Sequence, residues 1–509
     1  MSAVCERIAA AYANGPAAIH EVASGRAIEM SRLLAEASEL SDQLVARDLT
    51  GERLLIAIEP GIDWVRVFLA TLAAGAIAVP VPLSAPPAEL AYFASDSRAR
   101  AVFAGDSLRD RLPRELETLP LSATEVARHV RGKRSEASPA LILYTSGTTG
   151  RPKGAVITHQ NLLVQTSALR EAWAISHEDV LLHALPLHHL HGVVVALLSA
   201  LTAGATVRML PKFDAELWLR ELSAVTLVMA VPTMIQKILE RVEALSIGDR
   251  ERASASARSL RLFTSGSAAL PTSLAERFRA FAGSIPLERY GMTEIGIALS
   301  NPLEAARRKP GFVGSAIANI EHRIVHDDGE SGDGPGELWV RGPGVFAGYF
   351  DRPEATAECF RDGWFITGDV AVRDADGDVR LLGRKSADIL KTGGEKVSAL
   401  EIEEALREYE AFSEVAVVGV PDATWGDRVV AAVVVRSGFL PEASTDRVRA
   451  WAKSRLSPFK IPREVVVLDA LPKNAMGKVQ KGEIVSRLLA RAVPVSEPSG
   501  ADAFVPPKA

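Results

Sequence analysis

The sequence predicts an α/β fold in which a large N-terminal domain of stacked α/β subdomains precedes a small α+β C-terminal domain. Two observations lead to this prediction. Apolar strands recur between buried helices over most of the chain, and this alternation stops near residue 384, where charge and glycine become frequent. The chain has 509 residues, which is too long for one hydrophobic core.

The N-terminal part contains a strand–helix unit that appears twice. The segments FLATLAAGAIAVPV and LLSALTAGATVRML resemble each other, with helices expected at 62–73 and 196–202 and Gly204 ending the second. Apolar strands are expected at 54–58, 76–81, 101–104, 140–144, 206–210 and 226–231. Strands that alternate with buried helices predict largely parallel sheets.

The C-terminal part has a different pattern. Ser398 and Glu401 have the spacing of a capping box that opens a helix at 399–408. A second helix is expected at 446–456, with strands at 414–420, 429–435 and 465–468. The glycine-rich, charged segment 383–396 is typical of a hinge, so we expect domains at 1–383 and 384–492 and a disordered tail at 493–509.

Composition and charge exclude several classes of protein. A net charge of −5 without basic runs argues against a nucleic-acid partner. The most apolar stretch, 64–83, contains Arg66, Gly75 and two prolines, so we expect no membrane span. Cys5 and Cys359 cannot form a disulfide framework, and we do not expect the N-terminal stretch to act as an export signal, because it has no basic segment followed by a long apolar core. We therefore expect a reducing compartment, the cytoplasm.

The stretch LYTSGTTGRPKG, at 143–154, follows an apolar strand. Its glycines permit left-handed backbone angles, its hydroxyls and free N–H groups suit anionic oxygens, and Lys153 adds a mobile positive charge. The stretch does not fit a Walker A loop, because a glycine follows the lysine. These features predict a phosphate cradle; the alternative is a flexible surface loop.

Five further stretches complete a pattern: LPLHHLHG at 185–192, FTSGSAAL at 263–270, RYGMTE at 289–294, WFITGDV at 364–370 and LPKNAMGKVQK at 471–481. With the loop above, they resemble the motifs of the adenylate-forming superfamily, which includes acyl-CoA synthetases, nonribosomal adenylation domains and luciferases. The likeness covers nearly the whole chain in the same order. It implies that a carboxylate is activated with ATP and Mg²⁺ as an acyl-adenylate, and then transferred to coenzyme A.

The resemblance implies a role for each matching residue. Lys478, Glu294 and Thr293 would be catalytic, with Glu294 and Thr148 holding Mg²⁺. Contacts to ATP or AMP would come from Thr145, Ser146, Gly147, Thr148, Thr149, Lys153, Gly266, Ser267, Ala268, Tyr290, Gly291, Met292, Asp369 and Arg384. The alternative for Lys478 is a surface lysine on a loop.

The resemblance also implies that the C-terminal domain is a mobile lid. It would turn about the hinge and bring Lys391, Gly393 and Gly394 to coenzyme A. The hinge departs from the commonest pattern, because Ser386 stands where many relatives have aspartate or lysine.

Arg289 indicates which kind of carboxylic acid is activated. A buried arginine in an acyl pocket needs an anionic partner, which the second carboxylate of a dicarboxylic acid supplies. RYGMTEIGIALSNP, LHHLHG and KTGGEKVSALEIE look most like malonyl-CoA synthetases. The likeness implies that Arg289 grips the distal carboxylate of malonate and that His189 and His191 line the pocket. The alternative is a salt bridge from Arg289 to Glu288 or Glu294.

Other functions fit less well. Methylmalonate, another short acid and an external carrier protein as acceptor all stay open. The histidines at 183–191 have no acidic or cysteine neighbour that would complete a metal site. The segment 228–236 lacks the aspartate that would hold an amino-acid substrate, and neither TSG sequence has the GxSxG pattern of a serine hydrolase.

Overall fold

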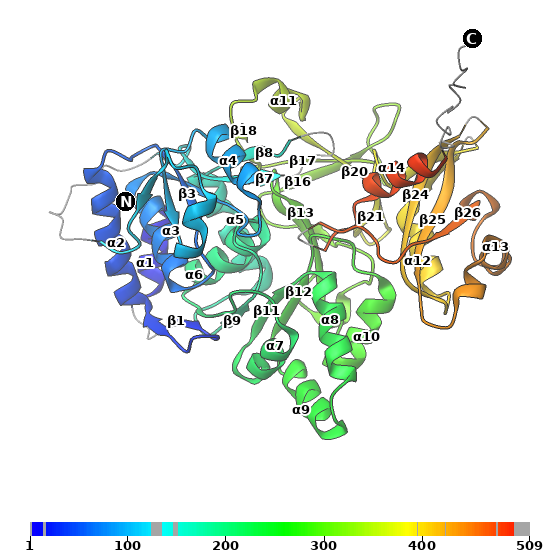
Figure 1. Ribbon diagram of the computed structural model, residues 1–509, viewed down its shortest axis with the longest axis horizontal. Helices are drawn as coiled ribbons and strands as arrows, with labels where there is room; N and C mark the ends of the chain where they lie inside the picture. The colour runs from blue at the N-terminus through cyan, green and yellow to red at the C-terminus, as the bar shows by residue number, and fades with distance from the viewer. Residues whose placement is uncertain are drawn as a thin grey trace, which may run out of the picture. The chain divides into compact units, whose positions relative to one another are not determined.

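The computed structural model describes residues 3–13, 17–123, 135–145, 151–393, 395–422, 424–474 and 477–492 (Figure 1). The chain forms two compact units, 1–381 and 382–509. The division falls two residues before the boundary expected from the sequence. The expected tail lies outside the described residues. In the part of the chain that is described, no helix combines the length and the apolar character that a membrane crossing needs.

The first unit contains a seven-stranded sheet among its described residues. Its order is β18 (Gly348–Tyr349), β8 (Lys153–Thr158), β7 (Pro139–Thr145), β4 (Ile77–Pro80), β3 (Arg53–Ala57), β5 (Ala101–Ala104) and β6 (Glu117–Leu119). The strands from β7 to β6 are parallel, as predicted, and β8 returns antiparallel to β7. The β7–β8 pair therefore presents the ends of its two strands on either side of the predicted phosphate loop.

A nine-stranded sheet lies in the same unit, again counting described residues. Its order is β15 (Ser315–Ala316), β14 (Gly296–Ser300), β13 (Leu287–Met292), β12 (Leu262–Ser265), β11 (Leu227–Ala230), β9 (Val180–His183), β10 (Thr206–Met209), β1 (Ala18–Glu21) and β2 (Ala27–Glu29). Strands β13 to β1 run parallel. Ser265 pairs with Glu288, so Gly266 follows in register with Arg289.

Helices cover these sheets in Figure 1. They are α1 (Ala3–Ala11), α2 (Met30–Ala46), α3 (Ile62–Ala74), α4 (Pro87–Asp96), α5 (His159–Trp173), α6 (Ser199–Ala203), α7 (Ala215–Glu221), α8 (Pro232–Glu243), α9 (Ile247–Arg258), α10 (Thr272–Ala282) and α11 (Pro353–Glu358). The two similar segments end their helices alike, at Gly75 and Gly204, with φ of 69° and 82°. Glycine suits both positions because a side chain disfavours that conformation.

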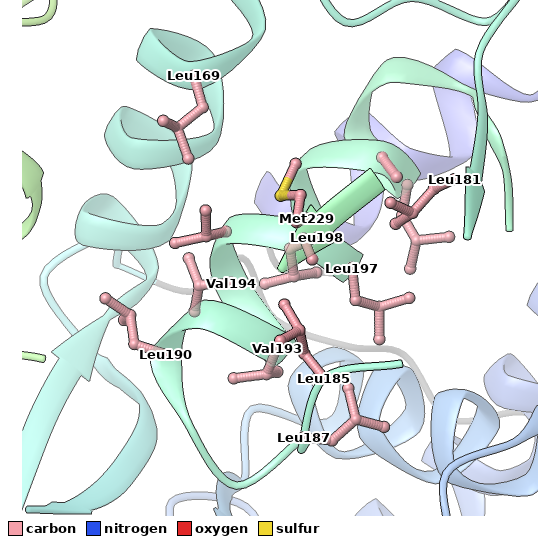
Figure 2. Packing of buried hydrophobic residues seen from close by; sticks show 14 of the residues in the cluster. Leu169, Leu181, Leu185, Leu187, Leu190, Val193, Val194, Leu197, Leu198 and Met229 are labelled. Atoms are coloured by element: carbon pink, nitrogen blue, oxygen red, sulfur yellow. The ribbon is translucent and has the colours of Figure 1, made fainter. Parts of the chain in front are cut away.

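The helix expected at 196–202 begins earlier than predicted. A π-helix spans His191–Leu198 and continues into α6. Figure 2 shows Val193, Val194, Leu197 and Leu198 of this segment packed among buried leucines and Met229. The early start requires Gly192, since a Cβ there would overlap the carbonyl group of Pro186. The apolar packing of this segment therefore fixes the position of His191, which is the first residue of the π-helix.

A smaller sheet completes the first unit. It orders β16 (Glu321–Val325), β17 (Gly336–Arg341), β20 (Trp364–Arg373) and β19 (Phe360–Arg361), and β21 (Val379–Arg384) also pairs with β20. Strand β20 alternates buried and half-buried residues from Phe365 onward, which places Asp369 on its buried side.

The second unit is an α+β module, as predicted. Its sheet orders β23 (Glu395–Ser398), β22 (Ile389–Thr392), β25 (Gly426–Val435) and β24 (Phe412–Asp422), and β26 (Glu464–Val467) pairs with β25. Its helices are α12 (Ala399–Arg407), α13 (Thr445–Ala452) and α14 (Lys481–Ala492). The predicted capping box is half present: Ser398 accepts from the N–H of Glu401, but the Glu401 carboxylate pairs with Lys460 at 2.6 Å instead.

Candidate active site

Arg289 lies on β13 and its side chain is buried, with 4% of the residue exposed. The strand register places Gly266 beside it, and a Cβ built on Gly266 would come within 2.6 Å of Arg289 Nε. Any side chain at position 266 would therefore displace the guanidinium group. The glycine of the FTSGSAAL motif makes room for this arginine.

The Arg289 guanidinium has no carboxylate partner among the described residues. Its Nε and Nη2 atoms are buried there without a hydrogen-bond partner. The two acids considered from the sequence are engaged elsewhere: Glu288 accepts from the N–H of Gly311 at 3.0 Å, and Glu294 accepts from the Tyr349 hydroxyl at 2.7 Å. Burial lowers the pKa of Arg289. An uncompensated buried cation is costly, so the site favours an anionic ligand.

A neutral histidine, His191, lies beside Arg289. His191 begins the π-helix, and its Nδ1 lies 3.1 Å from Ser267 Oγ in a hydrogen bond. Burial and the Arg289 charge hold the pKa of His191 well below its usual value, and its Nε2 is buried without a partner in the described part of the chain. Burial also lowers the pKa of His189 to about 4. The positive charge of Arg289 thus has a neutral imidazole, with an unused hydrogen-bonding nitrogen, as a neighbour.

His183 and His188 have other surroundings. His183 Nε2 donates to the carbonyl of Gly192 at 3.0 Å, so this histidine joins the end of β9 to the first turn of the π-helix. The ring centroids of His188 and His189 lie 4.2 Å apart, and burial together with His189 lowers the pKa of His188 to about 3.

The predicted phosphate loop starts and ends on paired strands. Thr145, the last residue of β7, lies opposite Lys153, the first residue of β8. Ser146, Gly147, Thr148 and Thr149 lie outside the described residues. Lys153 Nζ lies 5.2 Å from the centroid of the Tyr349 ring, whose hydroxyl donates to Glu294. Tyr349 therefore brings the predicted phosphate lysine and the predicted magnesium ligand to the same place.

Helix α4 contacts the residues on both sides of this loop. The Tyr92 hydroxyl donates to the Pro152 carbonyl at 2.7 Å, and the Tyr144 hydroxyl donates to Asp96 at 3.0 Å. Arg352 donates to the other oxygen of Asp96 at 2.5 Å. A cavity of about 450 Å³ is lined by Tyr92, Asp96, Arg352 and Lys153, among others. The sequence motifs did not point to Tyr92, Asp96 or Arg352. Tyr92 and Asp96 are four residues apart on one helix, a spacing that does not indicate a distant partner, and Arg352 lies just before α11, far from both in the sequence.

Tyr290 and Asp369 form a buried pair. The Tyr290 hydroxyl donates to Asp369 Oδ2 at 2.6 Å. Gly291 and Met292 end β13, Thr293 begins the turn to β14, and all three are half-buried. A Cβ on Gly291 would overlap the carbonyl of Gly296, so the turn needs glycine there. After β12, Ser267 has a φ of +69° and it and Ala268 are exposed.

The remaining predicted residues belong to the second unit. Lys478 is exposed, and its N–H donates to Asn474 Oδ1 at 3.0 Å. Gly393 donates its N–H to the Trp425 carbonyl at 2.9 Å, and Lys391 is exposed. Arg384 is half-buried, and Gly394 lies outside the described residues.

Comparisons with known proteins define the class. The model of the AMP-binding enzyme family matches residues 5–350, and that of the AMP-binding enzyme C-terminal domain matches residues 401–478. The chain belongs to the AMP-binding enzyme family.

Particular relatives are also similar. The mitochondrial malonate–CoA ligase of Mus musculus is 42% identical over 87% of this chain and 82% of that protein. ATP-bound MatB from Rhodopseudomonas palustris is 34% identical, with a TM-score of 0.86 over 95% of this chain and 98% of that one. A malonyl-CoA ligase ternary product complex with methylmalonyl-CoA and AMP is 36% identical, with a TM-score of 0.67 over 93% and 100%.

Proposed function

We propose that the protein is an AMP-forming malonate–CoA ligase, which converts malonate, ATP and coenzyme A into malonyl-CoA, AMP and pyrophosphate. The observation that carries this proposal is the buried Arg289 guanidinium without a carboxylate partner among the described residues. The distal carboxylate of malonate compensates this charge. Acetate leaves it buried and unpaired, which disfavours a monocarboxylic acid.

In the first step, the other carboxylate of malonate attacks the α-phosphorus of ATP. A P–O bond forms to give malonyl-AMP, and the bond to pyrophosphate breaks. Negative charge concentrates on the α-phosphate in the transition state, and Lys478 stabilises it there. Thr293 donates a hydrogen bond to the same phosphate. His191, neutral beside Arg289, completes the pocket for the distal carboxylate together with His189.

The nucleotide is held by residues of the first unit and by Arg384. Lys153 offsets negative charge on the outer phosphates, and the hydroxyls of the 145–149 segment donate hydrogen bonds to them. Asp369 accepts hydrogen bonds from the ribose, assisted by Arg384, and the segments Gly266–Ala268 and Tyr290–Met292 flank the adenine.

Glu294 suits a magnesium ion. Mg²⁺ is commonly held in proteins by one or two carboxylates together with substrate phosphates. Within the described ranges, no group of three or more histidine, cysteine, aspartate or glutamate side chains could hold a metal ion. Glu294, with Thr148 from the loop, would hold Mg²⁺, which shields phosphate charge when bound.

In the second step, the thiolate of coenzyme A attacks the malonyl carbonyl carbon, a C–S bond forms, and AMP leaves. The C-terminal unit acts as a lid that replaces Lys478 with the segment containing Lys391, Gly393 and Gly394. Glycines there allow the pantetheine chain to approach the backbone closely. We place this reaction in the cytoplasm, which suits the two free cysteines.

Methylmalonate is the second candidate substrate. It retains both carboxylates, so it satisfies Arg289 equally well, and a similar enzyme has been solved with methylmalonyl-CoA. The two acids differ by one methyl group, which a pocket discriminates by only about 1–3 kcal/mol.

The proposal is tested by identifying the products. Purified protein is incubated with ATP, Mg²⁺, coenzyme A and one acid from malonate, methylmalonate, succinate, acetate or octanoate, and thioesters and nucleotides are separated chromatographically. We expect malonyl-CoA with stoichiometric AMP. A parallel reaction replaces coenzyme A with a carrier protein that bears phosphopantetheine. Formation of ADP, a preference for acetate or octanoate, or transfer to the carrier alone would contradict the proposal.

A further inference from the structure

A buried cluster of charges lies in the second unit, close in sequence to Lys478. Lys481 Nζ lies 2.5 Å from Asp388 Oδ1 and 2.7 Å from Glu403 Oε1. The exposed fractions of these side chains are 14% for Lys481, 14% for Asp388 and 5% for Glu403. The lysine is therefore enclosed between two carboxylates and is unlike the exposed Lys478 three residues before it.

The same carboxylates also hold backbone groups from separate segments. Asp388 Oδ2 accepts the N–H of Arg384 at 2.9 Å, at the start of the unit. Glu403 Oε1 accepts the N–H of Val417 at 2.8 Å, in the middle of β24. Lys481 is the first residue of α14. Through the two carboxylates it joins the start of this helix to the segment that follows the domain boundary and to the central sheet.

Stability alone is a poor reason for this arrangement. Removing charges from water costs several kcal/mol per ion, and well-packed apolar replacements of a buried ion pair are often neutral or stabilising. Directed bonds to two backbone N–H groups instead specify how the segments are oriented. The cluster has the properties of a device that fixes geometry.

The segment before Lys481 is the loop that carries Lys478. Asn474 and Lys478 exchange two hydrogen bonds, from Asn474 N–H to the Lys478 carbonyl at 2.9 Å and from Lys478 N–H to Asn474 Oδ1 at 3.0 Å. Lys473 and Val479 form an isolated β-bridge at its base. The loop is internally ordered at these residues, so its direction depends on where its base is attached. On the C-terminal side, Lys481 is the charged attachment, beside the Gln480 N–H bond to the Pro472 carbonyl and the burial of Ile484.

We propose that Lys481 is a positioning residue for the first half-reaction: through Asp388 and Glu403 it fixes the Lys478 loop relative to the start of the C-terminal unit at Arg384. The inference rests on the proposed role of Lys478. Misplacing a catalytic group by about 1 Å can cost about 100-fold in rate. Lys481 does not itself touch the substrate.

The test separates the two half-reactions. Lys481→Met keeps the length of the side chain and removes its charge, Lys481→Arg restores the charge, and Lys460→Met removes a lysine–carboxylate pair elsewhere in the same unit. The first half-reaction is measured as malonate-dependent ATP–pyrophosphate exchange. The second is measured by accumulating malonyl-AMP on the enzyme without coenzyme A and then following its single-turnover consumption when coenzyme A is added.

We expect Lys481→Met to lower kcat for exchange roughly 10- to 100-fold. KM for ATP and malonate and the consumption rate should stay within about 3-fold of wild type, because Lys478 acts only in the first step. Lys481→Arg should recover much of the rate, and Lys460→Met should resemble wild type. Equal loss in both half-reactions, or no loss in a folded variant, would overturn the inference.

Two further variants keep the outcome decisive. If Lys481→Met does not fold, Asp388→Asn takes its place, since it retains the Lys481–Glu403 pair while weakening the link to Arg384, and the same criteria apply. Lys478→Ala tests the premise separately. If that variant exchanges pyrophosphate like wild type, the proposed role of Lys478 fails, whatever Lys481→Met shows.

Discussion

The Tyr290 hydroxyl donates a 2.6 Å hydrogen bond to Asp369 Oδ2, and both residues are buried. This bond connects β13 of the nine-stranded sheet to β20 of the smaller sheet. It orients the carboxylate that we assign to the ribose. A carboxylate accepts several hydrogen bonds, so Asp369 can hold Tyr290 and a ligand hydroxyl together.

Tyr290→Phe should raise KM for ATP about 10-fold or more. A hydrogen bond to a charged group contributes about 1.5–3 kcal/mol, and its loss removes one of the bonds that orient the Asp369 carboxylate toward the ribose. KM for malonate should not change, which initial-rate kinetics with each substrate varied in turn will show. Tyr409→Phe, which removes a hydroxyl bound to the Glu442 carbonyl in the other unit, is the matched control. A rise in KM for both substrates alike would count against the assignment.

Gly266→Ala should weaken malonate binding. The new methyl group would overlap the Arg289 guanidinium, and forcing an extra carbon into a packed site costs about 1–3 kcal/mol, or roughly 5- to 150-fold in KM. Gly248→Ala is the control, because its nearest neighbour is an arginine side-chain nitrogen 3.6 Å away. Unchanged malonate kinetics in a folded Gly266→Ala protein would mean that the guanidinium does not contact the substrate.

Glu294→Gln should increase the concentration of Mg²⁺ needed for half-maximal pyrophosphate exchange. A neutral amide is a weaker ligand for a hard cation than a carboxylate, although it still accepts the Tyr349 hydrogen bond. Titration with Mg²⁺ at fixed ATP measures the effect, and EDTA should abolish exchange by the wild type. Glu304→Gln, at an exposed acid, serves for comparison. Identical Mg²⁺ curves for Glu294→Gln and wild type would remove Glu294 from the metal site.

Tyr92→Phe should raise KM for ATP by about 2- to 10-fold and leave KM for malonate unchanged. The variant loses the 2.7 Å bond to the Pro152 carbonyl, and a neutral hydrogen bond contributes about 0.5–1.5 kcal/mol. Lys153, the next residue, is then held less firmly. Asp351→Asn disrupts the exposed pair with Arg98 and should have no effect on KM. A lower melting temperature with both KM values unchanged would indicate that Tyr92 only stabilises the fold.

The sequence was sufficient for the elements whose signal is local. The buried apolar strands of the first unit, and the C-terminal ends of the helices before Gly75 and Gly204, were predicted within one or two residues. The burial of Arg289 also followed from its chemistry and from the resemblance. These features depend on periodicity, on glycine conformation and on motifs that stay together along the chain.

Features that depend on distant partners could not be predicted. The π-helix starts at His191 because Gly192 packs against the Pro186 carbonyl, which only the folded turn creates. Glu401 fits a capping box by spacing, yet Lys460 competes for its carboxylate from 59 residues away. Tyr92 and Asp96 contact Pro152 and Tyr144, on either side of the predicted phosphate loop, from another element. Asp388 and Glu403 meet only at Lys481.

The central claim is that Arg289 binds the distal carboxylate of malonate. The most direct measurement is malonate-dependent ATP–pyrophosphate exchange in wild type, Arg289→Gln and the exposed control Arg307→Gln, with acetate as the comparison acid. Truncating one partner of a buried charge pair costs about 2–5 kcal/mol. We predict that kcat/KM for malonate falls at least about 30-fold in Arg289→Gln while that for acetate does not fall. Equal exchange with malonate in Arg289→Gln and wild type would contradict the account.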